Sequence, residues 1–426
     1  MAVSGRICAL ALGIVLVVPV RLGAQSAHPE PGASFGDDYA PRPAFPQQTR
    51  AHGPAEPSPV DVQVLASGLH HPWSFAFLPD GRILIAERPG QMRILSEGRL
   101  SPPLTGLPPI KAIGTKGLQD IALDPDFARN RMVYVAYFAP NPANPTPDSE
   151  EAMEAWLKLP PAVREAHKIG FESVGRARLS DDATALENFQ LILAAPSMGV
   201  RRLVFARDGS LLITADTPGA GDLPTGFEPQ ALNNLYGKVL RINPDGSIPR
   251  DNPFRNRRGV RPQIFAYGFR DPEGAALDPR TGLLWISENG PRGGDELNLV
   301  RPGRNYGFPA ISYGLDFQRR LLGTGKLQAP GMEQPVYFWT PSMATSGLAI
   351  YDGDLFPQWR GDIFLGALAA KRLIRLHLEN GKVAEEEHLL IDRGKRLRDV
   401  RQGPDGALYI LTDEDPGELL RLAPKS

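Results

Sequence analysis

Alternating apolar runs and short polar turns fill the chain from about residue 60 to its end. The recurring unit is an apolar run, a turn built on Asp-Gly or a close relative, and a second apolar run. Such a turn between apolar runs is a strong hairpin signal, because the tight turn needs positive φ, which glycine adopts readily. Six units are present, at residues 73–86, 120–137, 202–214, 274–286, 347–365 and 399–411.

Six hairpins at unequal spacing, roughly 60 residues apiece, are typical of the four-stranded blades of a propeller. We therefore predict an all-β fold, a six-bladed β-propeller over residues 61–426. The apolar run at 61–65 is expected to complete the last blade beside residues 419–422, which joins the two ends of the ring. A sandwich of two sheets is the alternative fold, but radial repetition accounts better for six similar hairpins.

One stretch departs from this pattern. Residues 147–168 carry acidic side chains early, basic side chains late and good helix formers between them. That charge order complements the helix dipole. We predict a short helical insertion in the second blade, on a rim of the ring.

The N-terminus has the features of a secretory signal. Arg6 precedes an apolar run at residues 7–20, and Gly23 and Ala24 suit cleavage near residue 24. Residues 1–24 are therefore interpreted as a signal peptide, which predicts a periplasmic or secreted protein that is free of the membrane after cleavage. Residues 25–60 are rich in Pro, Ala, Gly and Ser, and we expect a disordered linker there.

Composition and charge narrow the possible partners. The chain has 426 residues, of which 42% are hydrophobic and 22% charged, and its net charge is -1. No bulk field attracts nucleic acid or anionic lipid, so neither is expected as a partner. The single cysteine, Cys8, lies inside the signal, so the mature chain would contain no disulfide and would depend on packing.

The loop at residues 287–296 follows the fourth hairpin and contains three glycines, one proline and three acidic residues. Glycine permits close approach of the backbone to a ligand. Carbonyl and carboxylate oxygens are the ligands that calcium prefers. Composition alone favours a tight surface turn, and a calcium site is the alternative.

Four motifs decide between these interpretations, and together they resemble the soluble glucose/sorbosone dehydrogenases, in particular the periplasmic aldose sugar dehydrogenases. They are Gly-Pro-Arg-Gly-Gly-Asp-Glu at 290–296, Asn-Tyr-Gly-Phe-Pro at 305–309, Tyr-Gly-Phe-Arg-Asp-Pro-Glu-Gly at 267–274 and Arg-Leu-Arg-Asp at 396–399. The resemblance covers nearly the whole chain from residue 70 to 422. It implies a six-bladed propeller that oxidises a small-molecule sugar and passes electrons to an external acceptor.

The resemblance also implies two cofactors, pyrroloquinoline quinone (PQQ) and one Ca²⁺. The residues that match the family's calcium ligands are Gly290 and Pro291, through their carbonyl oxygens. Calcium there would act as a Lewis acid on the quinone carbonyl. The residues that match quinone contacts are Arg396, Arg398 and Tyr306, with Phe308 and Thr115 at two further cofactor positions.

Several of these positions depart from the family pattern. Met198 stands where the family has its general base, a histidine, and a thioether cannot take up the proton of a sugar hydroxyl. Thr115 replaces a cofactor-binding glutamine, and Ala369 replaces a lysine. Lys116 and Lys371 lie near these two positions and are candidate substitutes, although an offset of one or two residues on a strand changes the face or the depth.

Other groups are considered as the base. Asp216 and Glu288 end hairpin strands near the expected active face and are weak candidates, whereas none of the seven histidines lies near Met198 in sequence. Three functions therefore stay open. They are a PQQ- and Ca²⁺-dependent aldose dehydrogenase with altered or lost activity, a non-catalytic propeller that binds sugar, glycan or protein, and a calcium-dependent lactonase-like hydrolase.

Overall fold

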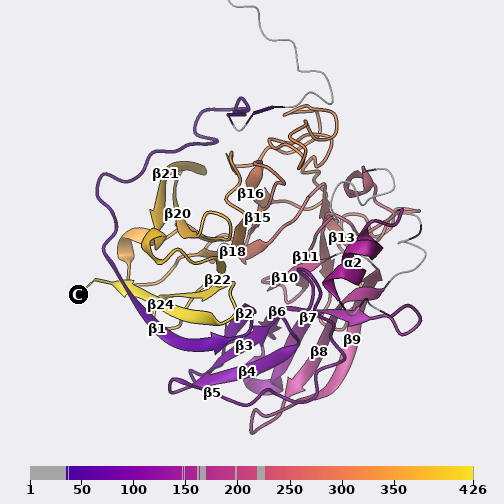
Figure 1. The fold of residues 1–426 in the computed structure, drawn as a ribbon, viewed down its shortest axis with the longest axis vertical. Helices are drawn as coiled ribbons and strands as arrows, with labels where there is room; N and C mark the ends of the chain where they lie inside the picture. The colour runs from indigo at the N-terminus through magenta and orange to yellow at the C-terminus, as the bar shows by residue number, and fades with distance from the viewer. Residues whose placement is uncertain are drawn as a thin grey trace, which may run out of the picture.

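The computed structural model describes residues 35–36, 38–145, 147, 149–160, 163, 169–196, 199–217 and 226–425. Its strands form six antiparallel sheets of four strands each, arranged around one axis (Figure 1). The predicted six-bladed β-propeller is thus confirmed. Each of the six predicted hairpins forms the first two strands of a blade.

The blades follow one another along the chain. Blade 1 contains β2 (Pro72–Phe77), β3 (Ile83–Glu87), β4 (Gln91–Ser96) and β5 (Arg99–Leu100). Blade 2 contains β6 (Leu118–Leu123), β7 (Met132–Pro140), β8 (Gly170–Leu179) and β9 (Leu186–Pro196). Blade 3 contains β10 (Val200–Phe205), β11 (Leu211–Ala215), β12 (Lys238–Ile242) and β13 (Ile264–Tyr267).

The second half of the ring repeats this order. Blade 4 contains β14 (Gly274–Leu277), β15 (Leu284–Glu288), β16 (Asp295–Val300) and β17 (Tyr337–Trp339). Blade 5 contains β18 (Thr345–Ile350), β19 (Ile363–Ala367), β20 (Arg372–Glu379) and β21 (Lys382–Leu389). Blade 6 contains β22 (Leu397–Gln402), β23 (Leu408–Thr412), β24 (Gly417–Pro424) and β1 (Val60–Leu69).

The ring closes as predicted from the sequence. β1, the first strand of the chain, pairs antiparallel with β24, the last, and Val62 lies opposite Leu422. Figure 1 shows β1 in indigo beside β24 in yellow. The N-terminal strand is therefore the outermost strand of the C-terminal blade, and its pairing covers the edge of β24 and joins the two ends of the ring.

The hydrophobic core lies between the blades. Each of the six buried apolar clusters is built from two neighbouring sheets. In the cluster between blades 5 and 6, Trp359 is fully buried and stacks on Phe356 with ring centroids 3.7 Å apart. Apolar side chains on both faces of each sheet therefore pack against the neighbouring blades.

The first strands of the blades line the central channel, and one arginine crosses it. Arg202 of blade 3 donates to the carbonyl oxygen of Glu273 before blade 4, at 2.7 Å, and to that of Arg398 in blade 6, at 3.2 Å. It also pairs with Asp399 of blade 6 at 3.0 Å and lies 3.7 Å from Asp120 of blade 2. A single guanidinium therefore links four blades.

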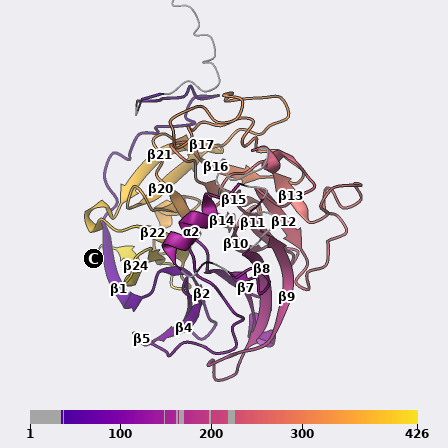
Figure 2. The same cartoon turned by 45° about the vertical axis from the view of Figure 1, so that its right-hand side comes forward.

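Antiparallel order places one set of loops on a common face, called here the upper face. It carries the loops that follow β3, β7, β11, β15, β19 and β23 and those that precede the first strand of each blade. The predicted helical insertion is confirmed as α2 (Glu150–Leu157), which begins at Ser149, whose side chain accepts a hydrogen bond from the Ala152 amide. α2 follows β7 and stands in front of the ring in both views (Figures 1 and 2).

Other helical segments are short. They are α1 (Phe127–Asn130) and the 3₁₀ turns η2 (Glu228–Gln230), η3 (Pro357–Trp359) and η4 (Ile391–Arg393). Within the described residues, no helix is both long and apolar enough to cross a membrane.

The segment before β1 differs from the expected linker where the structure describes it. Residues 38–59, called here the N-terminal arm, run along the outside of blades 4 and 5. Gln48 is fully buried and donates to the Pro335 carbonyl oxygen, and Ser58 hydrogen-bonds to the Glu387 carboxylate. These contacts use backbone groups and a few polar side chains, so apolar periodicity gives no sign of them.

The channel should be sensitive to loss of its carboxylates. Asp120 is 1% exposed, accepts a hydrogen bond from the Leu203 amide at 2.7 Å and pairs with Arg401 at 2.8 Å. Asp120→Ala should lower the free energy of unfolding by about 3–5 kcal/mol, because it leaves buried cations uncompensated. Urea unfolding followed by tryptophan fluorescence measures this. Asp126→Ala, at an exposed ion pair, is the matched control and should change stability by about 0.5 kcal/mol or less.

Candidate active site on the upper face

The topology brings most of the predicted site residues to the upper face. The β15–β16 loop carries Gly290 and Pro291, Asp216 follows β11, and Arg396 and Arg398 lie at the start of β22. Thr115 lies on the same side, in the loop before β6. The face therefore joins residues that are up to 283 positions apart, from Thr115 to Arg398.

The β15–β16 loop is folded too tightly for any side chain at its first glycine. A Cβ atom on Gly290 would lie 1.9 Å from the carbonyl oxygen of Gly293. The Gly290 amide donates to the Asp295 carboxylate at 2.9 Å, and the Gly294 amide donates to the Trp339 carbonyl oxygen at 2.8 Å. These two hydrogen bonds hold the β15–β16 loop against Asp295 of β16 and Trp339 of β17.

The carbonyl oxygens of this loop suit a hard cation. Those of Gly290 and Pro291 accept no hydrogen bond from any residue that the structure describes. Both residues line a pocket together with Glu288 and Glu296. Free carbonyl oxygens beside carboxylates are a donor set of the kind that Ca²⁺ prefers. Residues 290–291 therefore fit the calcium expected from the sequence.

Buried carboxyl groups surround the pocket. Burial raises the pKa of Glu288 to about 7, although the Arg270 amide donates to one of its oxygens at 2.7 Å. Burial, together with the charge of Glu288, raises the pKa of Glu296 well above its usual value. Asn298 donates to both carboxyl groups, at 2.8 and 3.1 Å. Bound calcium would offset the repulsion between these two groups.

The predicted aromatic residues line the same pocket. The Tyr306 ring stacks on Phe269 with centroids 4.6 Å apart, and its hydroxyl donates to the Leu299 carbonyl oxygen at 2.7 Å. Phe308 is 7% exposed, and its carbonyl oxygen accepts from Gln230 at 2.8 Å. The Tyr306 hydroxyl is thus engaged within blade 4, and the two rings offer the pocket an apolar wall.

Arg396 and Arg398 share one carboxylate. Both donate to Asp413, at 2.9 and 3.0 Å respectively. Burial alone would raise the pKa of Asp413, but the charges and hydrogen bonds of the two arginines outweigh it and lower the pKa to about 2. The Arg398 guanidinium also binds Glu273 at 2.9 Å and covers the Trp73 ring at 3.9 Å. Arg398 is 5% exposed and Arg396 41%, so Arg396 is the one that can turn toward a ligand.

A third arginine, Arg201, links this pair to the β15–β16 loop. Arg201 of β10 is 6% exposed and binds Asp216 at 2.7 Å and Asp271 at 3.2 Å, and it lies 3.6 Å from Glu273. The backbone carbonyl oxygen of Asp271 accepts from the Asn289 amide at 3.0 Å. A continuous chain of contacts therefore runs from the calcium loop through Arg201 to Arg398.

Asp216, a weak candidate for the base, belongs to this chain. One carboxylate oxygen binds Arg201, and the other accepts from the Gly199 amide. Both oxygens of the Asp216 carboxylate are therefore already engaged within the protein. Met198 lies outside the described residues, and Gly199 is the nearest described residue after it.

The substitutes considered for the lost polar positions lie apart from one another. Thr115 is exposed on the rim, whereas the Lys116 ammonium binds Glu172 at 2.7 Å. Glu172 is fully buried, and burial raises its pKa against the opposing charge of Lys116. Ala369 and Lys371 are both exposed, and the Ala369 amide donates to the Met343 carbonyl oxygen at 3.1 Å.

The arrangement disfavours a lactonase-like calcium on the axis. The described part of the chain contains no group of three or more His, Cys, Asp or Glu side chains that could hold a metal. Asp216 is bound to Arg201, Glu288 to Arg270 and Asn298, and the channel is crossed by the Arg202 guanidinium. A cation at the channel centre would meet another cation.

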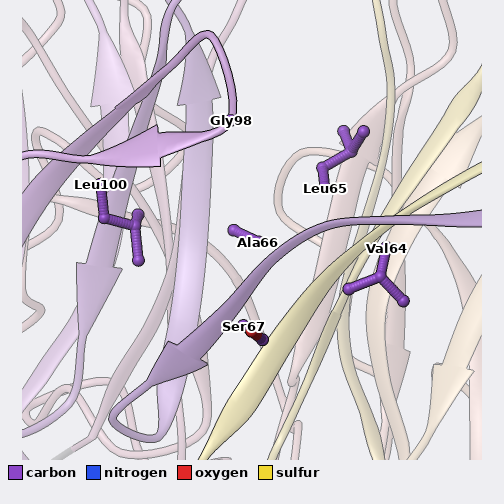
Figure 3. A pocket seen from close by; sticks show the side chains of 6 residues that line it. All are labelled: Val64, Leu65, Ala66, Ser67, Gly98 and Leu100. Carbon is purple, nitrogen blue, oxygen red and sulfur yellow. The ribbon is translucent and has the colours of Figure 1, made fainter.

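A second pocket lies far from this chemistry, at the outer seam between blades 6 and 1. Figure 3 shows Leu65, Ala66 and Ser67 of β1 facing Gly98 and Leu100 of blade 1, with Val64 at the edge. No charged side chain lines it. The upper face is therefore the candidate active site.

Comparison with known proteins agrees with this geometry. A sequence model of the family described as "Glucose / Sorbosone dehydrogenase" matches residues 69–421, which is most of the chain. The chain belongs to the glucose/sorbosone dehydrogenase family. The resemblance inferred from the four motifs is confirmed.

Three comparisons are informative. The chain is 40% identical over 381 residues to the aldose sugar dehydrogenase YliI of Escherichia coli, covering 87% of this chain and 95% of that protein. The apo-form crystal structure of the soluble aldose sugar dehydrogenase from Escherichia coli superposes with a TM-score of 0.76 at 39% identity, covering 86% of this chain and all of the other. The PQQ-bound aldose sugar dehydrogenase of Streptomyces coelicolor has a TM-score of 0.64 at 25% identity, over 87% of this chain and 99% of its own.

Sequence reasoning missed the buried charges that organise the face. Arg201, Asp271, Glu273 and Asp413 come from blades 3, 4 and 6 and meet only in the fold. One signal in the sequence points to them. Acidic residues at 271 and 273 directly precede an inner strand, where side chains are expected to be buried, so they indicate buried ion pairs.

The tight loop yields a prediction about the metal. Gly290→Ala should weaken Ca²⁺ binding by roughly tenfold or more, about 1.4 kcal/mol, because the new methyl group forces the Gly293 carbonyl oxygen away. Isothermal titration with CaCl₂ measures this. Gly53→Ala is the matched control, since its Cβ would meet nothing closer than 3.7 Å. Equal affinities in both variants would place the calcium elsewhere.

The buried carboxyl next to Arg201 yields a prediction about pH. Burial raises the pKa of Asp271 to about 6. The folded chain therefore holds this proton at pH values where the unfolded chain has lost it, so the contribution to stability falls as pH rises from about 4 to about 6. Asp271→Asn should flatten the decline of Tm over that range in calcium-free buffer. An unchanged slope in the variant would contradict this assignment.

Proposed function

We propose that this chain is a PQQ- and Ca²⁺-dependent sugar dehydrogenase with slowed proton removal. Membership of the family supports oxidation of a sugar, and the PQQ-bound relative supports the cofactor. The observation that carries the proposal is the loop at Gly290 and Pro291, whose free carbonyl oxygens face a pocket beside buried carboxyl groups.

The residues around the loop have separate tasks. Gly290 and Pro291 would hold the calcium, while Arg396 would bind a carboxylate of the quinone, since planar guanidinium groups match carboxylates. Bound quinone would supply a hydride acceptor, and bound calcium would supply Lewis-acid chemistry beside it. Arg398 keeps Asp413 and Glu273 in place behind Arg396 rather than reaching a ligand itself.

Proton removal is the weak step in this chain. Met198, at the family's histidine position, cannot accept a proton, and Asp216 is held by Arg201 and the Gly199 amide. Oxidation of a sugar hydroxyl to a carbonyl releases a proton as well as a hydride, so a group in the site must accept that proton. We therefore propose that the chain binds its cofactors as the family does and turns over slowly.

The proposal extends to the chain as a whole. Residues 1–24 act as a signal for export to the periplasm or the medium, and an external acceptor reoxidises the quinone. A non-catalytic sugar-binding propeller is the second candidate, and Met198 is the observation that favours it. The lactonase-like alternative lacks its set of metal ligands among the described residues.

Titration of the metal-stripped protein with PQQ and CaCl₂, followed by dye-linked oxidation of a panel of aldoses, tests the proposal. We expect saturable quinone binding at micromolar concentration and slow turnover. Arg396→Gln should weaken quinone binding by roughly 10- to 100-fold, because a charge-assisted pair contributes about 1.5–3 kcal/mol. Absence of quinone binding in the wild type would overturn the dehydrogenase assignment.

A histidine at position 198 should restore the missing step. Met198→His is expected to raise kcat by about 10²–10⁴-fold, the range that a positioned general base supplies, with little change in quinone affinity. Stopped-flow reduction of the bound quinone by sugar measures it. Quinone binding with no turnover in either protein would favour the non-catalytic alternative.

A further inference from the structure

We infer that the N-terminal arm positions the calcium loop, and that Gln48 is one of the residues through which it does so. The arm precedes residues 69–421, which match the family, so this contact belongs to a part of the chain outside the family core. The prediction about calcium affinity rests on the proposed function, whereas the structural link between Gln48 and the loop does not.

Gln48 is buried at the outer edge of blade 4. Its side-chain oxygen accepts from the Ala44 amide at 2.6 Å and from the Tyr313 hydroxyl at 3.3 Å, and its side-chain nitrogen donates to the Pro335 carbonyl oxygen at 2.9 Å. Its own carbonyl oxygen accepts from the Phe338 amide at 2.8 Å. The amide side chain thus joins the arm to Pro335, which precedes β17, and to Tyr313, while the backbone of Gln48 binds Phe338 within β17.

β17 is only three residues long and depends on its neighbours. It pairs with the start of β16, where Trp339 lies opposite Asp295 and Phe338 opposite Glu296. Phe338 stacks on Tyr313 at 4.0 Å. Gln48 therefore binds the backbone of β17 and the hydroxyl of the ring that covers it.

β17 in turn holds the calcium loop. The Trp339 carbonyl oxygen accepts from the Gly294 amide at 2.8 Å, and the Asp295 carboxylate opposite Trp339 accepts from the Gly290 amide at 2.9 Å. Arg292 forms an antiparallel bridge with Leu315, which lies in the long loop between β16 and β17 that also contains Tyr313. Two contacts thus separate Gln48 from the loop that would bind calcium.

The C-terminal part of the arm, residues 52–58, is attached to blade 5. His52 pairs with Glu385, and the Ser58 hydroxyl donates to Glu387, which Arg375 also binds at 2.8 Å. These contacts hold the arm to blade 5. Between them and Gln48, the Ala51 amide donates to the Tyr337 hydroxyl of β17 at 2.7 Å, and Glu386, whose amide donates to the His52 carbonyl oxygen, accepts from the Tyr337 and Trp339 side chains at 2.6 and 2.8 Å. The Ser58 side chain contacts neither β16 nor β17 among the described residues. Ser58 therefore provides a matched control within the same arm.

Hydrogen exchange in the full mature chain without metal tests the inference. Gln48→Met keeps the volume and removes the side-chain hydrogen bonds. We expect it to speed exchange of the amides at residues 290–297 by roughly tenfold or more, since the loop opens more often. Ser58→Ala should leave these amides unchanged. The inference is wrong if the amides of this segment exchange as slowly in Gln48→Met as in the wild type. It is also wrong if Gln48→Met and Ser58→Ala speed their exchange equally.

Calcium affinity provides the second measurement, with CaCl₂ alone as the probe. Gln48→Met should weaken binding by about tenfold, and Ser58→Ala should not. If Gln48→Met folds poorly, Tyr313→Phe, which removes the hydroxyl that binds Gln48 and keeps the ring that stacks on Phe338, replaces it in both measurements. Should the wild type bind no calcium, the metal assignment fails, while the exchange data still decide whether the arm holds the loop.

Discussion

The guanidinium of Arg202 lies across the central channel and joins four of the six blades. A buried cation of this kind is tolerated only if carboxylates and carbonyl oxygens surround it, because desolvation of a single charge is unfavourable by several kcal/mol. Asp120 and Asp399 meet that condition, and Arg401 binds both of them. The register of the inner strands is therefore set by charge as well as by the apolar clusters between the sheets.

The same principle extends to the upper face. Arg201, Arg398 and Arg396 alternate there with Asp216, Asp271, Glu273 and Asp413. These pairs satisfy each other within the protein, so the face is rigid and close to neutral before any ligand arrives. The calcium loop differs, because its carbonyl oxygens are free and its neighbours Glu288 and Glu296 repel each other. A cation bound at this loop would offset the repulsion between the Glu288 and Glu296 carboxyl groups.

The sequence predicts the fold well because its signals are local. Each Asp-Gly turn specifies its own hairpin, and six hairpins leave few architectures to choose from. Strand β1 was also predictable, since its alternation matches that of β24. The N-terminal arm and the Arg201 contacts were not, because their partners are tens to hundreds of residues away and no periodic pattern marks them. For the site, the motifs predict roles for the β15–β16 loop and Arg396, whereas the burial of Arg398 depends on Trp73 and Glu273 from two other blades and has no signal in the sequence.

Closure of the ring by β1 and β24 has a consequence for biosynthesis. The partner of β1 is the last strand to leave the ribosome, so β1 stays unpaired while some 350 residues are made, as the distance from Leu69 to Gly417 shows. The blades between them can form in order, but the circle is completed only when the chain is released. Release of the last strand is therefore the step that completes the ring, and a chain that ended before Gly417 would leave β1 without its partner strand.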